Sequence, residues 1–254
     1  MGEALLAGWI AAGHEPADLL VVEADQERAA ALVQRHGVRI VDYAQAASAE
    51  TVILAVKPHQ ILAALRQIGP SLPDPTLVVS IAAGVTCARV AASLQPGQPV
   101  VRVMPNTPAL VGQGMAGVCG GPSATPEHLA RVVDLMSAVG RAIEVSESAM
   151  DALTALSGSG PAYLFYVADA MIEAGVHQGL SRAQARELVA QTIVGAGAML
   201  AGSDRSAAEL REQVTSPAGT TAAALRVLED RGVRAGFLGA IQACAERSAE
   251  LGQA

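Results

Sequence analysis

The sequence is poor in aromatic side chains, which make up 2% of its 254 residues. Hydrophobic residues still account for 51% of the chain, so any core must be built from Ala, Val, Leu and Ile. A chain of this length and composition can form one or two cores. Because alanine-rich helices approach each other closely, the composition also favours a tightly packed helical unit.

Cysteine, histidine and positive charge are also scarce. The three cysteines (Cys87, Cys119 and Cys244) are far apart and form no Cys-x-x-Cys, and the five histidines are scattered. This spacing argues against a disulfide framework or a metal site and predicts buried thiols in a reducing cytoplasm. The formal net charge of −7 argues against nucleic acid or an anionic membrane as a partner. Apolar runs are too short or too glycine-rich for a spanning helix, so we expect a soluble protein.

The first half of the chain alternates short apolar runs with helical segments. A helix is expected from Asp25 to a stop at Gly37, and another is opened by Pro58. Apolar strands separated by helices are typical of a parallel sheet covered on both faces, and predict a doubly wound, Rossmann-like α/β domain. The expected strands are residues 19–23, 38–41, 51–56, 77–81 and 100–103.

The first element of such a fold has no counterpart here. The chain opens on a helix in which Gly2 stands where the last glycine of a Gly-x-Gly-x-x-Gly loop would be. The missing strand is normally central, so its absence would leave two neighbouring strands with unpaired edges. We expect that the sequence begins inside a longer reading frame. The alternative is a fold that never had this strand.

From about Glu147 the strand-like runs disappear and helices take over. We therefore predict two domains: residues 1–146 form the dinucleotide-binding domain and residues 147–254 an all-helical domain. The first helical stretch is broken at Ser157-Gly-Ser-Gly-Pro161, where glycines allow a backbone or a substrate to come close. A simple helix kink is the alternative. Further helices are expected at 181–202, 206–214, 217–230 and 233–251.

A candidate anion site lies in the helical half, within residues 214–225. Ser216-Pro217 is typical of a helix start, because Ser can cap a helix and Pro at its first position loses no needed donor. Gly219 would let a ligand approach the backbone, and Thr220 and Thr221 add hydroxyls beside the free N–H groups. The alternative is an ordinary capped helix.

Two strand ends carry the candidate cofactor residues, since doubly wound folds bind dinucleotides at the carboxyl ends of their strands. Lys57 could donate to ribose hydroxyls or be a solvated loop lysine. Asn106 could face the cofactor or satisfy the backbone of its own turn. The candidates are Ala55, Val56, Lys57 and Pro58 after one strand, and Asn106 and Thr107 after another.

The residues after the first expected strand bear on the choice of cofactor. Glu23 could bond a ribose 2′-hydroxyl, Asp25 follows it, and the nearest cation is Arg28 on the next helix. Two carboxylates would repel a 2′-phosphate, which favours NADH, but the sequence leaves both NADH and NADPH open. Asp25 could instead be only a helix cap.

Four motifs together resemble the pyrroline-5-carboxylate reductase family, in the same order and spacing. They are Ala55-Val-Lys-Pro58, Arg102-Val-Met-Pro-Asn-Thr-Pro108, Ala155-Leu-Ser-Gly-Ser-Gly-Pro-Ala-Tyr163 and Val214-Thr-Ser-Pro-Ala-Gly-Thr-Thr221. The resemblance implies hydride transfer from NADPH or NADH to 1-pyrroline-5-carboxylate, the last step of proline synthesis. It also implies a domain-swapped helical homodimer, or a ring of such dimers.

The resemblance assigns roles to the helix-start residues. The substrate carboxylate would be held by Ser216 and by the N–H groups of Gly219, Thr220 and Thr221. The hydroxyl of Thr221, as the catalytic residue, would bond the ring nitrogen. Ala218 stands where the family usually has glycine, which is harmful if its φ is positive. The alternatives are another imine or hydroxyacid dehydrogenase and a non-catalytic oligomeric or binding protein.

Overall fold

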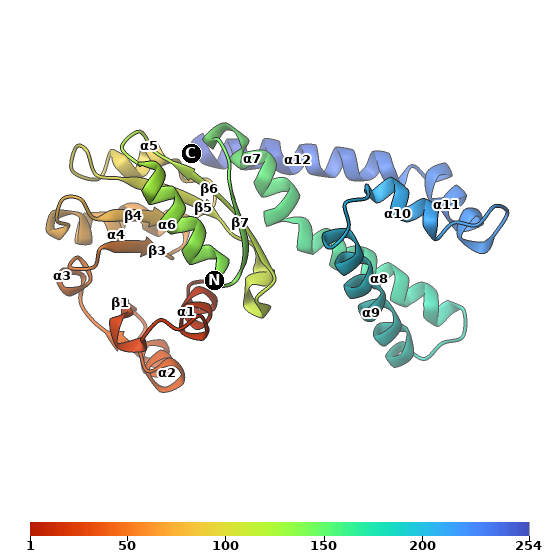
Figure 1. The fold of residues 1–254 in the computed structure, drawn as a ribbon, viewed down its shortest axis with the longest axis horizontal. Helices are drawn as coiled ribbons and strands as arrows, with labels where there is room; N and C mark the ends of the chain where they lie inside the picture. The colour runs from red at the N-terminus through yellow and green to blue at the C-terminus, as the bar shows by residue number, and fades with distance from the viewer. Residues whose placement is uncertain (254) are drawn as a thin grey trace. The chain divides into compact units, whose positions relative to one another are not determined.

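The computed structural model describes residues 1–253, and they fold into two compact units (Figure 1). The first unit comprises Met1–Ser159 together with the described part of the stretch from Ala243 onward. The second unit is Gly160–Gln242. The domain boundary expected between residues 146 and 147 stays a prediction.

The first unit is built on a five-stranded sheet in the order β3-β4-β5-β6-β7. Neighbouring strands are parallel except β5 and β6, which are antiparallel. The last two strands were not expected from the sequence, since one of them is glycine-rich. Gly117 in that strand faces Leu153, whose side chain would have to move to admit a Cβ there. The strands are β3 (Thr51–Leu54), β4 (Leu77–Ser80), β5 (Val100–Met104), β6 (Gly114–Gly120) and β7 (Gly140–Glu144).

Helices cover both faces of this sheet, which confirms the doubly wound class. Alternate residues of the buried strands point to opposite faces. Val78 and Val100 pack with α4 (Ile61–Ile68) and α5 (Cys87–Ala91) in one core. In the other core, Val79 and Val101 pack with α1 (Gly2–Ala11) and α6 (Pro126–Ser137).

A second, two-stranded sheet pairs β1 (Leu20–Val21) with β2 (Arg39–Ile40), and α2 (Gln26–His36) connects them. Gly37 ends α2 in the left-handed conformation, as expected. Within residues 1–253, β1 pairs with β2 alone and β3 with β4 alone. The two unpaired strand edges expected from the sequence are therefore present. The short α3 (Tyr43–Ala46) follows β2.

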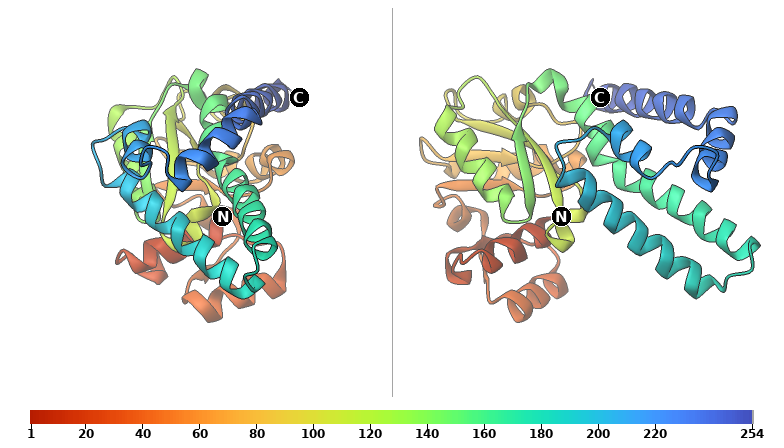
Figure 2. Two further views of the ribbon diagram at one scale, coloured as in Figure 1. Left: turned by 90° about the vertical axis from the view of Figure 1, so that its right-hand side faces the viewer. Right: turned by 45° about the vertical axis from the view of Figure 1, so that its right-hand side comes forward.

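The second unit is helical. Ser181 caps α9 through a capping box, and Ser206 caps α10 in the same way. Among the described residues of this unit, Ala185 and Val189 alone are buried. The unit by itself therefore has almost no core. Its helices, which Figure 2 shows in two further views, are α8 (Gly160–His177), α9 (Arg182–Ala201), α10 (Ala207–Gln213), α11 (Thr220–Asp230) and most of α12 (Val233–Gln253). No helix in residues 1–253 is long and apolar enough to cross a membrane.

Candidate active site

The segment after β3 is exposed, as a ligand-binding strand end must be. Ala55, Val56 and Lys57 are all exposed at the carboxyl end of the strand. The N–H of Lys57 donates to Oε1 of Gln60 at 3.2 Å, and Pro58 begins the 3₁₀ turn that leads into α4. The local structure is as expected, and the role of the Lys57 ammonium stays a prediction.

Gly2 brings the start of α1 against this strand end. A Cβ added to Gly2 would lie 3.0 Å from the Cβ of Ala55, closer than side chains normally come. Met1 caps α1 without a side-chain hydrogen bond. Close helix–strand packing is what the last glycine of a dinucleotide-binding loop provides. The cofactor-binding role of Gly2 stays a prediction.

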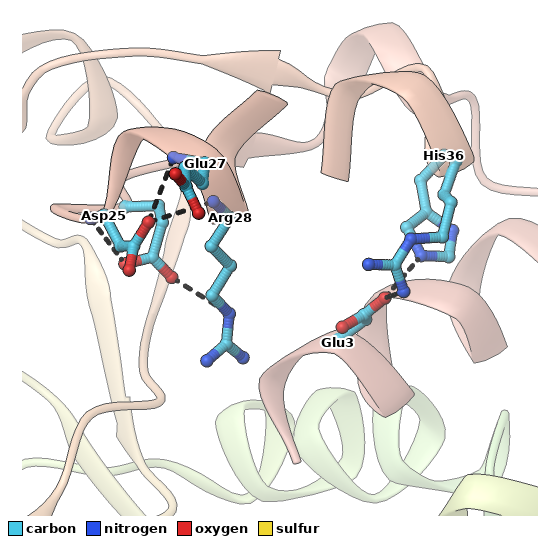
Figure 3. Close-up of polar contacts among 7 residues, drawn as sticks. Glu3, Asp25, Glu27, Arg28 and His36 are labelled. Atoms are coloured by element: carbon cyan, nitrogen blue, oxygen red, sulfur yellow. Dashed lines mark hydrogen bonds and ion pairs between the residues drawn. The ribbon is translucent and has the colours of Figure 1, made fainter. Parts of the chain in front are cut away.

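The two acidic residues after β1, Glu23 and Asp25, make different contacts. Oδ1 of Asp25 accepts from the N–H groups of Glu27 and Arg28, both at 3.0 Å, so Asp25 is the N-cap of α2 (Figure 3). Glu23 accepts from the N–H of Asp25 at 3.1 Å and forms an ion pair with Nε of Arg28 at 3.3 Å. Glu23 thus stays the candidate ribose ligand, but a cation that could meet a 2′-phosphate lies beside it.

A second polar cluster, also drawn in Figure 3, joins α1 to α2. Oε1 of Glu3 lies 2.6 Å from Nη1 of Arg35 and 3.3 Å from Nε2 of His36. The hydrogen bond from His36 lowers the pKa of Glu3 below its usual value, and the charge of Arg35 lowers it further. The cluster therefore holds the two helices together through an ionised carboxylate.

The side chain of Asn106 is buried and anchors other segments. Its Oδ1 accepts from the N–H of Met115 at 2.8 Å, and its Nδ2 donates to the carbonyl and the hydroxyl of Ser157 at 3.1 and 3.3 Å. The Asn106 amide therefore bonds residues outside its own turn, and both its oxygen and its nitrogen already have partners. Thr107 begins the 3₁₀ turn Thr107–Val111. The sequence did not reveal the partner of Asn106, because Ser157 is 51 residues away.

The break at Ser157 is a single π-helical turn, Thr154–Gly158, between α7 (Met150–Leu153) and α8. The N–H of Ser159 donates to the carbonyl of Thr154 at 2.9 Å. A Cβ on Gly158 would lie 2.7 Å from Cε of Met104 at the end of β5. The neighbour of Gly158 is thus a side chain, and the expected approach of a backbone or a substrate stays a prediction. π turns of this kind occur frequently at functional sites.

The start of α11 differs from the expectation. The helix begins at Thr220, with Gly219 as N-cap, and not at Ser216-Pro217. The reason is a preceding turn in which the N–H of Gly219 donates to the carbonyl of Ser216 at 3.0 Å. A Cβ on Gly219 would force the hydroxyl of Ser216 to move and would lie 3.1 Å from the carbonyl oxygen of Ser216, so the turn favours glycine there.

This arrangement leaves open donors at the start of α11. The Gly219 cap makes no side-chain hydrogen bond. Within residues 1–253, no acceptor is recorded for the N–H groups of Thr220, Thr221 and Ala222. Thr220 is exposed and Thr221 half-buried. Uncapped N–H groups at a positive helix end favour an anion, and the expected anion site stays a prediction. The N–H of Gly219 is already occupied by the carbonyl of Ser216.

Ala218 adopts the conformation that the sequence marked as harmful. Its φ is 57°, in the left-handed region, and it is the one residue other than glycine in the described chain with a positive φ. A Cβ in this region is strained, so the absence of the usual glycine costs stability in the turn that precedes α11.

Two family descriptions match the chain. "Pyrroline-5-carboxylate reductase dimerisation" matches residues 147–251, and "NADP oxidoreductase coenzyme F420-dependent" matches residues 1–84. Among curated proteins, the pyrroline-5-carboxylate reductase of Corynebacterium melassecola is 48% identical, covering 100% of this chain and 96% of the relative. That of Escherichia coli K12 is 39% identical over 99% of this chain and 94% of the relative.

Solved structures agree. A pyrroline-5-carboxylate reductase from Coxiella burnetii superposes with a TM-score of 0.94 at 36% identity, covering 98% of this chain and 94% of that one. The Plasmodium falciparum enzyme, crystallised with NADP bound, superposes with a TM-score of 0.88 at 30% identity. The match covers 99% of this chain and 94% of that one. These likenesses do not favour a non-catalytic protein or another dehydrogenase. The chain belongs to the pyrroline-5-carboxylate reductase family and is an oxidoreductase that forms proline from 1-pyrroline-5-carboxylate.

Proposed function

We propose that the start of α11 binds the carboxylate of 1-pyrroline-5-carboxylate. The observation that supports this is the uncapped helix end, where the N–H groups of Thr220 and Thr221 lack an acceptor within the described residues. A carboxylate there would accept those hydrogen bonds and interact with the helix dipole. Ser216 and Gly219 shape the turn that exposes these donors.

Thr221 is the proposed catalytic residue. Its hydroxyl would hydrogen-bond the ring nitrogen and hold the C=N bond in one orientation. The protonated imine is already electrophilic, so orientation is the main contribution asked of the protein. No His or Cys nucleophile is needed.

The proposed cofactor is NADPH or NADH, which supplies the hydride when bound. The residues assigned to it are Gly2, Glu23, Ala55, Val56, Lys57, Pro58, Asn106 and Thr107. The exposed strand end and the close packing of Gly2 on Ala55 fit a dinucleotide. The buried Asn106 fits a direct cofactor contact less well, because its amide already donates to Ser157. It would instead position the backbone around Ser157.

A homodimer formed through the helical unit, or a ring of such dimers, completes the proposal. Large apolar side chains such as Leu164, Phe165 and Tyr166 are exposed on α8. Exposed large apolar side chains of this kind are typical of a surface that another protein chain covers. We also propose a cytoplasmic location, which the three free cysteines support.

Replacing Thr221 tests the proposed mechanism. A hydrogen bond to a charged group contributes about 1.5–3 kcal/mol, so Thr221→Ala should lower kcat/KM by about 10- to 100-fold. Steady-state kinetics with 1-pyrroline-5-carboxylate provide the measurement. Thr221→Ser keeps the hydroxyl and should restore most of the activity, while Thr220→Ala, at the exposed neighbour, should have a smaller effect. Unchanged kinetics of Thr221→Ala would remove Thr221 from the mechanism.

A further inference from the structure

Three potential metal ligands from distant parts of the chain meet inside the first unit. Cys87 begins α5, Cys119 lies on β6, and Glu147 begins a 3₁₀ turn before α7. One ligand atom from each, the two sulfurs and a carboxylate oxygen, lies within 4.8 Å of the other two. Both cysteines are fully buried, and the Glu147 side chain is 35% exposed. The spacing in the sequence argued against a metal site, but the fold brings these residues together.

The carboxylate is held in place beside the two thiols. Oε1 of Glu147 accepts from the N–H of Cys87 at 2.7 Å. The same oxygen lies 3.5 Å from Nη1 of Arg102, whose side chain is 5% exposed. Because a backbone donor and a buried guanidinium already fix this carboxylate, ligand binding would cost little additional side-chain entropy at Glu147.

The charges of the cluster suit a divalent cation. With neutral thiols, Arg102 and Glu147 balance each other. Binding of a divalent metal that displaces one proton from each thiol leaves this balance unchanged, because two protons leave and two positive charges enter. The cluster therefore avoids the cost of an uncompensated buried charge.

The kinds of ligand select the metal. Thiolates favour thiophilic ions such as Zn²⁺ and its analogue Cd²⁺, and oxygen-preferring Mg²⁺ and Ca²⁺ are disfavoured. Sulfurs bound at about 2.3 Å from one zinc lie about 3.8 Å apart, so the observed spacing of up to 4.8 Å requires only a small contraction. We propose that Cys87, Cys119 and Glu147 bind one thiophilic divalent cation with release of two protons. None of the three is assigned to substrate or cofactor, so the site would stabilise α5, β6 and the chain before α7.

The test is a titration of the reduced, metal-free full-length protein with Cd²⁺. We expect one equivalent to bind with the ultraviolet absorption of a cadmium–thiolate bond, with two protons released and an increase in Tm. Cys119→Ser should remove the absorption at stoichiometric Cd²⁺. Glu147→Gln keeps an acceptor for the N–H of Cys87 and should weaken binding at least about tenfold while the absorption remains.

Cys244 supplies the matched control. It lies on α12, outside the cluster, with its sulfur 3.2 Å from the hydroxyl of Ser159. Cys244→Ser should bind Cd²⁺ like the wild type. Equal binding by Cys119→Ser and wild type, or no cadmium–thiolate absorption in the wild type, would overturn the proposal. Two further results would also overturn it: thiols that stay buried in the core without binding the metal, and thiols that oxidise to a Cys87–Cys119 disulfide without binding the metal. Circular dichroism verifies that each variant is folded. If a cysteine variant does not fold, Glu147→Gln still tests the metal site.

Discussion

At residue 218 the backbone is left-handed, with φ at 57°, although the side chain is that of alanine. The turn from Ser216 to Gly219 requires this conformation, because it delivers the N–H of Gly219 to the carbonyl of Ser216. An alanine in this region costs about 1–2 kcal/mol. The protein accepts this strain directly before the proposed substrate site.

Ala218→Gly should therefore stabilise the protein. Relief of about 1–2 kcal/mol of strain is partly offset by the greater freedom of glycine in the unfolded chain, so we expect a gain of about 0.5–1 kcal/mol in the free energy of unfolding. Urea denaturation provides the measurement. Ala224→Gly, the same substitution inside α11, should instead destabilise by about 1 kcal/mol. A loss of stability in Ala218→Gly would contradict the strain argument.

Glu23 carries the prediction on cofactor choice. If its carboxylate binds the ribose 2′-hydroxyl, NADH should give a higher kcat/KM than NADPH, and Glu23→Gln should reduce that preference. Arg28, which pairs with Glu23, would then be free to meet a 2′-phosphate. The measurement compares both cofactors in both proteins. A wild-type preference for NADPH would refute the assignment.

At the scale of elements, α1 and α2 are joined by one carboxylate. Glu3 contacts Arg35 and His36 across the two helices. Its pKa is lowered in the folded state, chiefly by the hydrogen bond from His36. The stabilisation is thus present above the unfolded pKa and is lost as the pH falls through the lowered folded pKa.

Glu3→Gln tests this link. Ion pairs with this degree of exposure contribute about 0.2–1 kcal/mol, so the variant should lose that much stability at neutral pH and less in high salt. The difference in the free energy of unfolding between Glu3→Gln and the wild type should vanish once the pH lies well below about 4. Unfolding curves at several pH values measure it, and Glu15→Gln, an exposed carboxylate outside this cluster, serves as control. A difference that persists at low pH would show that Glu3 acts by packing.

Most elements could be predicted because their signals are local. Asp25 caps α2 and Gly37 ends it, and the buried strands β3 to β5 follow apolar runs. Strand β6 was missed because its glycines have low strand propensity, and the neighbour that Gly117 faces, Leu153, is distant in the sequence. The start of α11 was misplaced by three residues, from Pro217 to Thr220, because a preceding turn binds the N–H of Gly219.

At the scale of the whole molecule, the helical unit exposes many large apolar side chains. Ala185 and Val189 are its only buried residues within the described chain, while Phe165 is 70% exposed. Helical stability in proteins comes mainly from packing of an apolar face. A second copy that covers these side chains would supply the missing core.

Phe165→Asp should therefore weaken the oligomer. A charge in an apolar interface must be desolvated, so we expect dissociation or loss of the folded helical unit, whereas the wild type stays oligomeric at micromolar concentration. Sedimentation equilibrium measures the state of each protein. Val33→Asp, at an exposed apolar position on α2, should leave the oligomer intact. A wild type that sediments as a monomer would contradict the proposed dimer.

The sequence by itself determined the fold class, the family and the order of the motifs, because strand runs, helix caps and short motifs are encoded by residues close together in the chain. Only the tertiary structure decided what joins distant residues: the bonds of Asn106 to Ser157 and the meeting of Cys87, Cys119 and Glu147. It also decided the sign of φ at Ala218. These features depend on how separate segments pack and turn, and local propensity does not specify either.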